Sequence, residues 1–75
     1  PDGADDRARR DVVLAALRAL PERQREVIAL RYYLDLSEQE IAETLGISRG
    51  AVKSHASRGA AGLREQLADL WEDTP

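Results

Sequence analysis

Basic side chains gather in one stretch of this chain, and their chemistry suits a polyanion. Residues 44–64 contain no acidic residue, although the 75-residue chain has 14 Asp and Glu residues and a net charge of −3. The same stretch holds Arg49, Lys53, Arg58 and Arg64. Arg and Lys donate hydrogen bonds to phosphates and to O6 and N7 of guanine. A basic stretch on an otherwise acidic chain therefore predicts a surface that binds DNA.

The candidate DNA-binding residues follow from the helical period of this stretch. If Val52 and Ala56 face inward, the period places five residues outward: Arg49, Gly50, Lys53, Ser54 and Ser57. The hydroxyl of Ser48 and the N–H groups of a helix start suit a phosphate, and so does Arg58 one turn farther along. Of the basic residues elsewhere, Arg31 is the one we expect to contact the DNA backbone.

These polar residues also have ordinary structural interpretations. Arg49 and Lys53 could form a solvated helix face, and exposed serines often contact nothing. We expect His55 to pack or to meet a phosphate rather than to read a base. Arg23 and Arg25 are typical of a solvated face. The turn that precedes the basic stretch and the absence of acids favour the DNA interpretation.

Composition argues against several other classes of protein. A chain of 75 residues forms one small domain whose thin core leaves no room for a catalytic cleft. With no Cys and one His, neither a disulfide nor a zinc site is expected, and no cofactor is implied. No acid–base or nucleophile–base pair is evident, so we do not expect an enzyme. No apolar run approaches the ~20 residues of a membrane span, and a soluble cytoplasmic protein is expected.

The first half of the chain is expected to form two helices. Asp5 or Asp6 can cap the first, which runs to about Leu20. Its apolar stripe is Val13, Leu17 and Leu20, widened by Val12, Leu14 and Ala16. Pro21 suits the first turn of the second helix. The stripe of that helix is Val27, Leu30 and Leu34, widened by Ile28 and Tyr32.

The second half reads as a helix-turn-helix. Ser37 and Glu40 have the spacing of a capping box that starts the third helix. Gly46 suits the left-handed residue that ends it, and Ser48 can cap the fourth helix. The expected inward residues of the third helix are Ile41, Ala42 and Leu45. Those of the fourth are Val52, Ala56, Ala60, Leu63, Leu67 and Leu70.

The predicted fold is therefore an all-α, four-helix domain that contains a helix-turn-helix, like a winged helix without its wing. We expect residues 1–5 to be a linker or cut end and residues 6–72 to be the domain. Gly59 and Gly62 lie inside the fourth helix, where each costs ~1 kcal/mol relative to Ala. Packing must therefore hold that helix.

Five segments together resemble region 4 of bacterial RNA polymerase sigma factors, most closely the extracytoplasmic-function group. They are residues 20–27, 30–33, 37–42, 46–54 and 57–59. The resemblance covers about Val12 to Leu67. It implies that this chain is a fragment of a longer protein, because such factors need a second domain that melts DNA.

The resemblance also implies a role for each face. Region 4 reads the upstream (−35) promoter element with its last helix, which assigns base and phosphate contacts to Arg49, Gly50, Lys53, Ser54 and Ser57. It assigns a backbone contact to Arg58. Its other face holds the flap of the polymerase β subunit, and the corresponding apolar residues here are Leu17, Val27 and Leu30. In many relatives an anti-sigma factor binds that same surface.

Two other interpretations remain open from the sequence. The output domain of LuxR-type response regulators shares a sequence like Val52-Lys53-Ser54-His55, although its last helix normally continues differently. Alternatively, the chain is a module used mainly for protein interaction, which the acidic balance and thin core would suit. Binding to promoter-like duplex at two salt concentrations separates this second alternative from a DNA-binding domain.

Overall fold

Four helices follow one another along the chain. The structure is a computed structural model that describes the backbone of residues 2–72 and the side chains of residues 7–69. The helices are α1 (Asp2–Arg18), α2 (Glu22–Tyr32), α3 (Glu38–Leu45) and α4 (Arg49–Glu72). Residues 2–72 contain no strand, and none of their helices is long and apolar enough to cross a membrane. The predicted all-α, four-helix class is confirmed.

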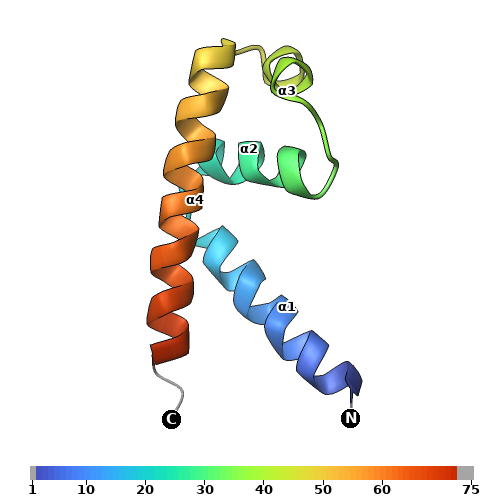
Figure 1. Cartoon of the computed structure of the whole chain (residues 1–75), viewed down its shortest axis with the longest axis vertical. Coiled ribbons are helices and arrows are strands. Elements are labelled where there is room, and N and C mark those ends of the chain that lie inside the picture. Colours follow the sequence, from blue (N-terminus) through green and yellow to red (C-terminus); the bar gives the residue numbers. More distant parts are fainter. Residues whose placement is uncertain (1, 73–75) are drawn as a thin grey trace.

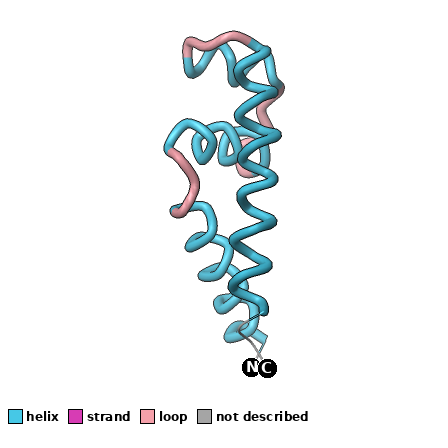
Figure 2. Tube along the Cα trace, turned by 90° about the vertical axis from the view of Figure 1, so that its left-hand side faces the viewer, coloured by secondary structure: helices cyan, strands magenta, loops and turns pink. Residues whose placement is uncertain are grey.

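The molecule is elongated because α4 forms its long axis. Its principal extents are 42 × 23 × 14 Å. Figure 1 shows α1, α2 and α3 succeeding one another along α4, with α3 at the end where α4 begins. The view turned by 90° shows the same order along α4 (Figure 2). Each of the three shorter helices packs against α4, so α4 positions all of them.

Two of the expected helix starts need correction. The first helix begins at Asp2, so Asp5 and Asp6 lie inside it and are not its caps. Pro21 is the residue before α2, with φ −54° and ψ 147°, and not the first residue of its first turn.

The core consists of two clusters that meet on α2. The cluster near the helix-turn-helix buries Val27, Ile41, Ala42 and Val52, with Leu30, Leu36, Leu45, Ile47 and Ala56 packed around them. The other buries Leu17, Leu20 and Ile28, with Val13 and Leu63 packed against them. Adjacent residues of α2, Val27 and Ile28, thus anchor different clusters. The side chains of Leu70, expected to face inward, and of Trp71 lie outside the described residues.

Three residues expected to face inward are exposed. Leu14 is 36% exposed, Tyr32 66% and Leu34 65%. α1 packs mainly against α4, so a narrow stripe of α1 is covered and Leu14 lies beyond its edge. α2 ends at Tyr32, and Asp35 then adopts a left-handed φ of 56°. The chain therefore leaves the helical period before Leu34, and the side chain of Leu34 faces solvent. Tyr32, the last residue of α2, faces solvent too.

Gly59 and Gly62 lie where α4 closely approaches its neighbours. A Cβ built on Gly59 would lie 2.8 Å from Cγ1 of Ile28 and 3.4 Å from the carbonyl oxygen of Gln24. A Cβ on Gly62 would lie 2.7 Å from Cδ2 of Leu20. The sequence showed the cost of these glycines to helix formation. The structure shows what they permit, which is close packing of α4 on α2 and on the end of α1.

We expect Gly59→Ala and Gly62→Ala to differ in stability. Each gains ~1 kcal/mol of helix propensity, and overpacking costs typically ~1–3 kcal/mol. At Gly59 the obstructing Cγ1 is close to the backbone of Ile28 and a carbonyl lies behind it, so the variant should be less stable by ~1–2 kcal/mol. At Gly62 the terminal methyl of Leu20 can turn aside, and the variant should lie within ~0.5 kcal/mol of the parent.

Urea unfolding followed by far-UV circular dichroism measures both differences. The two substitutions serve as controls for each other because both occupy the interior of α4. A Gly59→Ala variant as stable as Gly62→Ala would contradict the close-packing interpretation.

Candidate nucleic-acid interface

The helix-turn-helix formed by α3 and α4 is fixed by local hydrogen bonds at the start of α3 and at its end. The backbone N–H of Glu40 donates to Oγ of Ser37 over 3.1 Å, and the N–H of Ser37 donates to Oε1 of Glu40 over 3.0 Å. The predicted capping box is therefore confirmed. Gly46 ends α3 with φ 68° and ψ 36°, as predicted, and the next N–H, that of Ile47, donates to the carbonyl of Ala42 over 3.1 Å.

Ser48 starts α4 as predicted. The N–H of Ala51 donates to its Oγ over 3.0 Å, and the N–H of Val52 donates to its carbonyl oxygen over 3.0 Å. The hydroxyl thus accepts from the helix and still has its own O–H to donate. Because Ser48 is exposed, that O–H can reach a phosphate from solvent.

The predicted DNA-binding residues of α4 and its cap share one exposed surface, which we call the basic face. Its members are all exposed: Ser48, Arg49, Gly50, Lys53, Ser54, Ser57 and Arg58. On the opposite side of the same turns, Val52 has no exposed surface and Ala56 is half-buried. His55 is half-buried too, and its Nδ1 is buried with no hydrogen-bond partner among the described residues. The helical period thus separates the basic face from the packed side, as the sequence predicted.

The charges of the basic face are not neutralised by the described part of the domain. Among the described side chains, the ion pair within 4.0 Å joins Arg23 to Glu26 over 2.9 Å. No described carboxylate pairs with Arg49, Lys53 or Arg58. Unpaired guanidinium and ammonium groups on one helix face can donate to a polyanion without first breaking an internal ion pair. The arrangement therefore suits DNA.

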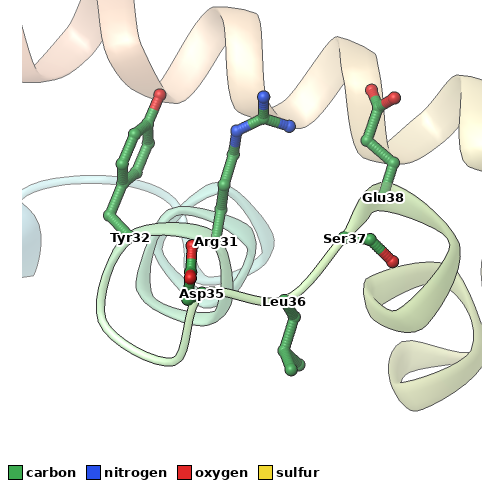
Figure 3. Close-up of a pocket in the computed structure, with 6 residues that line it drawn as sticks. All are labelled: Arg31, Tyr32, Asp35, Leu36, Ser37 and Glu38. Atoms are coloured by element: carbon green, nitrogen blue, oxygen red, sulfur yellow. The ribbon is translucent and has the colours of Figure 1, made fainter.

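Arg31, the predicted contact outside α4, has different surroundings. It is half-buried and lines a hollow of about 330 Å³ between the end of α2 and the start of α3. The other lining residues are Tyr32, Asp35, Leu36, Ser37 and Glu38. Figure 3 shows the side chains of Arg31, Tyr32 and Glu38 extending to one side of the α2–α3 connection. The guanidinium carbon of Arg31 lies 5.9 Å from the centre of the Tyr32 ring.

The residues expected to bind a protein partner lie mostly in the core. Val27 has no exposed surface and Leu17 is 7% exposed, so these two side chains offer little area to a partner. Leu30 is half-buried against the cluster around Val27. The spacing of apolar residues placed these positions on the apolar edge of the first two helices. In the structure, residues of α4 pack against that edge. Their side chains hold the helices together, and the partner-binding role expected for Leu17 and Val27 stays a prediction.

A left-handed turn between two capped helices, the second of which presents an unpaired basic face, defines a helix-turn-helix of the DNA-binding class. The model of the family described as Sigma-70, region 4, matches residues 10–61. The chain belongs to this family. The resemblance to region 4 of sigma factors is therefore confirmed, and the LuxR-type alternative is not supported. Region 4 is the domain with which sigma factors bind the −35 element of promoters.

Individual relatives agree with the family match. The chain is 39% identical over 66 residues to the RNA polymerase sigma-E factor of Streptomyces antibioticus, covering 88% of this chain and 37% of that protein. It is 40% identical over 65 residues to SigF of Mycobacterium tuberculosis, covering 87% and 25%. It is 49% identical over 51 residues to the ECF sigma factor SigW of Bacillus subtilis, covering 68% and 27%. The chain thus spans well under half the length of these relatives.

The capping box makes the stability of the start of α3 depend on pH. The backbone N–H of Ser37, and next its side chain, hold the pKa of the Glu40 carboxyl below its ordinary value of 4.5. A carboxyl whose pKa is lowered by folding stabilises the folded state above the unfolded pKa, and this contribution is lost as pH falls through the folded pKa. We therefore expect Glu40→Gln to melt below the parent at neutral pH, and the difference to shrink below pH 4.5.

Thermal unfolding of both proteins across this range measures the effect. Glu43→Gln removes the same charge from α3 at a carboxylate that accepts from the Gln39 side chain and lies outside the capping box. A constant difference between Glu40→Gln and the parent, down to the most acidic pH, would contradict the assignment.

Proposed function

We propose that this domain binds the −35 promoter element as part of a longer sigma factor that directs RNA polymerase in transcription initiation. The observation that carries the proposal is the basic face, which is exposed, forms no ion pair with a described residue and lies on the second helix of the helix-turn-helix. Membership of the region 4 family supports the same function. Because the chain covers 37% of the length of one such relative, the activity of the whole protein is proposed from that likeness.

The basic face divides into base-reading and phosphate-binding parts by position. In a helix-turn-helix the second helix enters the major groove with its N-terminal residues against the base edges. Arg49 and Lys53 stand there and can donate to guanine, while Ser54 and Ser57 can donate or accept. Gly50 carries no side chain, which permits a close approach. The remaining members of the basic face suit phosphates.

We expect Arg49→Ala and Lys53→Ala each to weaken binding to a cognate promoter duplex. The expected loss is ~1–3 kcal/mol where the side chain makes a bidentate base contact, with a smaller loss on unrelated duplex. Arg58→Ala should weaken binding to all duplexes about equally and should flatten the dependence of log K on log salt by ~0.9. Fluorescence anisotropy of labelled duplexes, titrated at several salt concentrations, measures all three changes.

Arg23→Ala is the matched control, because it removes one Arg that is paired with Glu26 and lies outside the basic face. It should leave affinity and salt dependence near the parent values. If the three test variants and the control all bind like the parent protein, the groove assignment is wrong.

We also propose that the protein partners are RNA polymerase core, through the flap of its β subunit, and an anti-sigma factor. Family membership supports this proposal. Leu17 and Val27, which are expected in this surface, are at most 7% exposed, so other residues must supply most of its area. Leu14, 36% exposed, lies on α1 beside the covered stripe, and Leu30 is half-buried on α2. We assign the flap contact to a surface that includes Leu14.

Leu14→Asp should weaken binding of a β-flap fragment at least tenfold, because it places a charge in an apolar contact. Leu34→Asp, at a leucine that is 65% exposed in the α2–α3 connection, is the control and should bind like the parent. Calorimetric titration of the fragment compares them. Equal affinities for the two variants would place the flap elsewhere. Tight flap binding without any duplex binding at low salt would favour a protein-interaction module.

A further inference from the structure

His55 lies on α4 between the basic face and the packed side, and its two ring nitrogens have different surroundings. The residue is half-buried, and Nδ1 is the nitrogen that is buried without a hydrogen-bond partner among the described residues. The exposed part of the ring is therefore the edge that carries Nε2. A buried polar atom without a partner costs free energy, and an apolar side chain of similar size would avoid that cost. This is a reason to look for a role at Nε2.

The burial of Nδ1 decides where the proton of the neutral ring lies. A neutral imidazole has one N–H, which donates, and one bare nitrogen, which accepts. An N–H on Nδ1 would be a buried donor without an acceptor, whereas an N–H on Nε2 can donate to water or to a ligand. The imidazolium would carry an N–H on both nitrogens, and no described carboxylate lies within 4.0 Å of the ring to accept from it. His55 therefore presents a neutral Nε2–H donor.

His55 shares one side of α4 with two residues of the basic face that suit phosphates. Residues three and four apart lie on the same side of a helix, so a row runs from Ser48 through Ala51 and His55 to Arg58. Ser48 and Arg58 are exposed, while Ala51 and His55 are half-buried. The row thus follows the border between the basic face and the packed side.

This border is the part of a groove-binding helix that meets the walls of the groove. The major groove is ~12 Å wide, and an α-helix with its side chains is ~10–12 Å across. When the basic face points at the base edges, the sides of the helix therefore lie against the sugar–phosphate strands. His55 stands between Ser48 and Arg58 along one such side, so all three face the same wall.

We propose that Nε2–H of His55 donates a hydrogen bond to a DNA phosphate, as a neutral donor between the phosphate contacts of Ser48 and Arg58. This inference rests on the proposed DNA-binding function and adds a residue to it. A neutral donor gains affinity from the charge of the phosphate but neutralises none of it, so no condensed counterion is released. His55 therefore contributes equally at low and at high salt, unlike Arg58.

Two substitutions of His55 test this contact on promoter and unrelated duplexes, titrated at several salt concentrations. His55→Leu keeps an apolar side chain of similar size and removes the N–H. It should weaken binding to both duplexes about three- to tenfold and leave the salt slope unchanged. His55→Gln keeps an amide N–H near the position of Nε2 and should bind within about twofold of the parent protein. Arg58→Ala, measured beside them, should instead flatten the slope by ~0.9.

Gln66→Leu is the matched control. It removes an N–H donor from another half-buried residue of α4, beyond the basic face, and should bind like the parent. Circular dichroism confirms that each variant is folded. The inference is overturned if His55→Leu binds like the control, if its slope falls by ~0.9 as for a lost charge, or if His55→Gln binds as weakly as His55→Leu.

Proton–nitrogen correlation spectra of the unsubstituted chain test the same contact without a variant. His55 is the only histidine, so its ring signals are unambiguous. At about pH 8 we expect the proton on Nε2, and saturation with duplex should protect that proton from exchange with solvent. A proton on Nδ1, or an Nε2 signal that duplex leaves unchanged, would contradict the assignment. The effect of Arg58→Ala tests DNA binding independently, so failure of the His55 contact and failure of the proposed function are distinguishable.

Discussion

The contact of α4 with α2 is the interaction on which the rest of the structure depends. α2 anchors both core clusters through adjacent residues, Val27 and Ile28, and α4 crosses it where Gly59 permits a close approach. On one side of this crossing α4 packs with α3 and forms the helix-turn-helix. On the other it packs with α1. Because α4 is one continuous helix of 24 residues, its angle on α2 sets the direction of the basic face.

Local chemistry is the part of the fold that the sequence predicts best. The capping box of Ser37 and Glu40, the left-handed Gly46 and the cap at Ser48 each depend on residues within four positions of one another. Hydrogen bonds of this kind require no knowledge of tertiary structure. The turn that directs α4 could therefore be predicted, and with it the exposure of the basic face. The position of each face on α4 followed from two residues expected to face inward, Val52 and Ala56, and the helical period.

The burial of a side chain by a helix that is distant in the sequence could not be predicted in this way. The apolar period shows that Leu17 and Val27 share an edge, but not that α4 covers it. It places Leu34 on the stripe of α2, although the helix ends first. Gly59 carries no apolar side chain to signal burial, and its role appears only when Ile28 is found against it. The hollow at Arg31 likewise requires two helices to be placed relative to each other.

The continuity of α4 also limits the length of the basic face. Arg58 is exposed, while Gly59, the next residue, is buried, so the turn that ends the basic face is the turn that packs on α2. Beyond that turn, α4 packs in the second cluster through Leu63.

The extent of the molecule is 42 Å along its longest axis, several times the Debye length of ~8 Å in physiological salt. Acidic residues on the remote parts of the domain are therefore largely screened from DNA. A net charge of −3 is compatible with DNA binding for this reason, because residues 44–64 contain no acid.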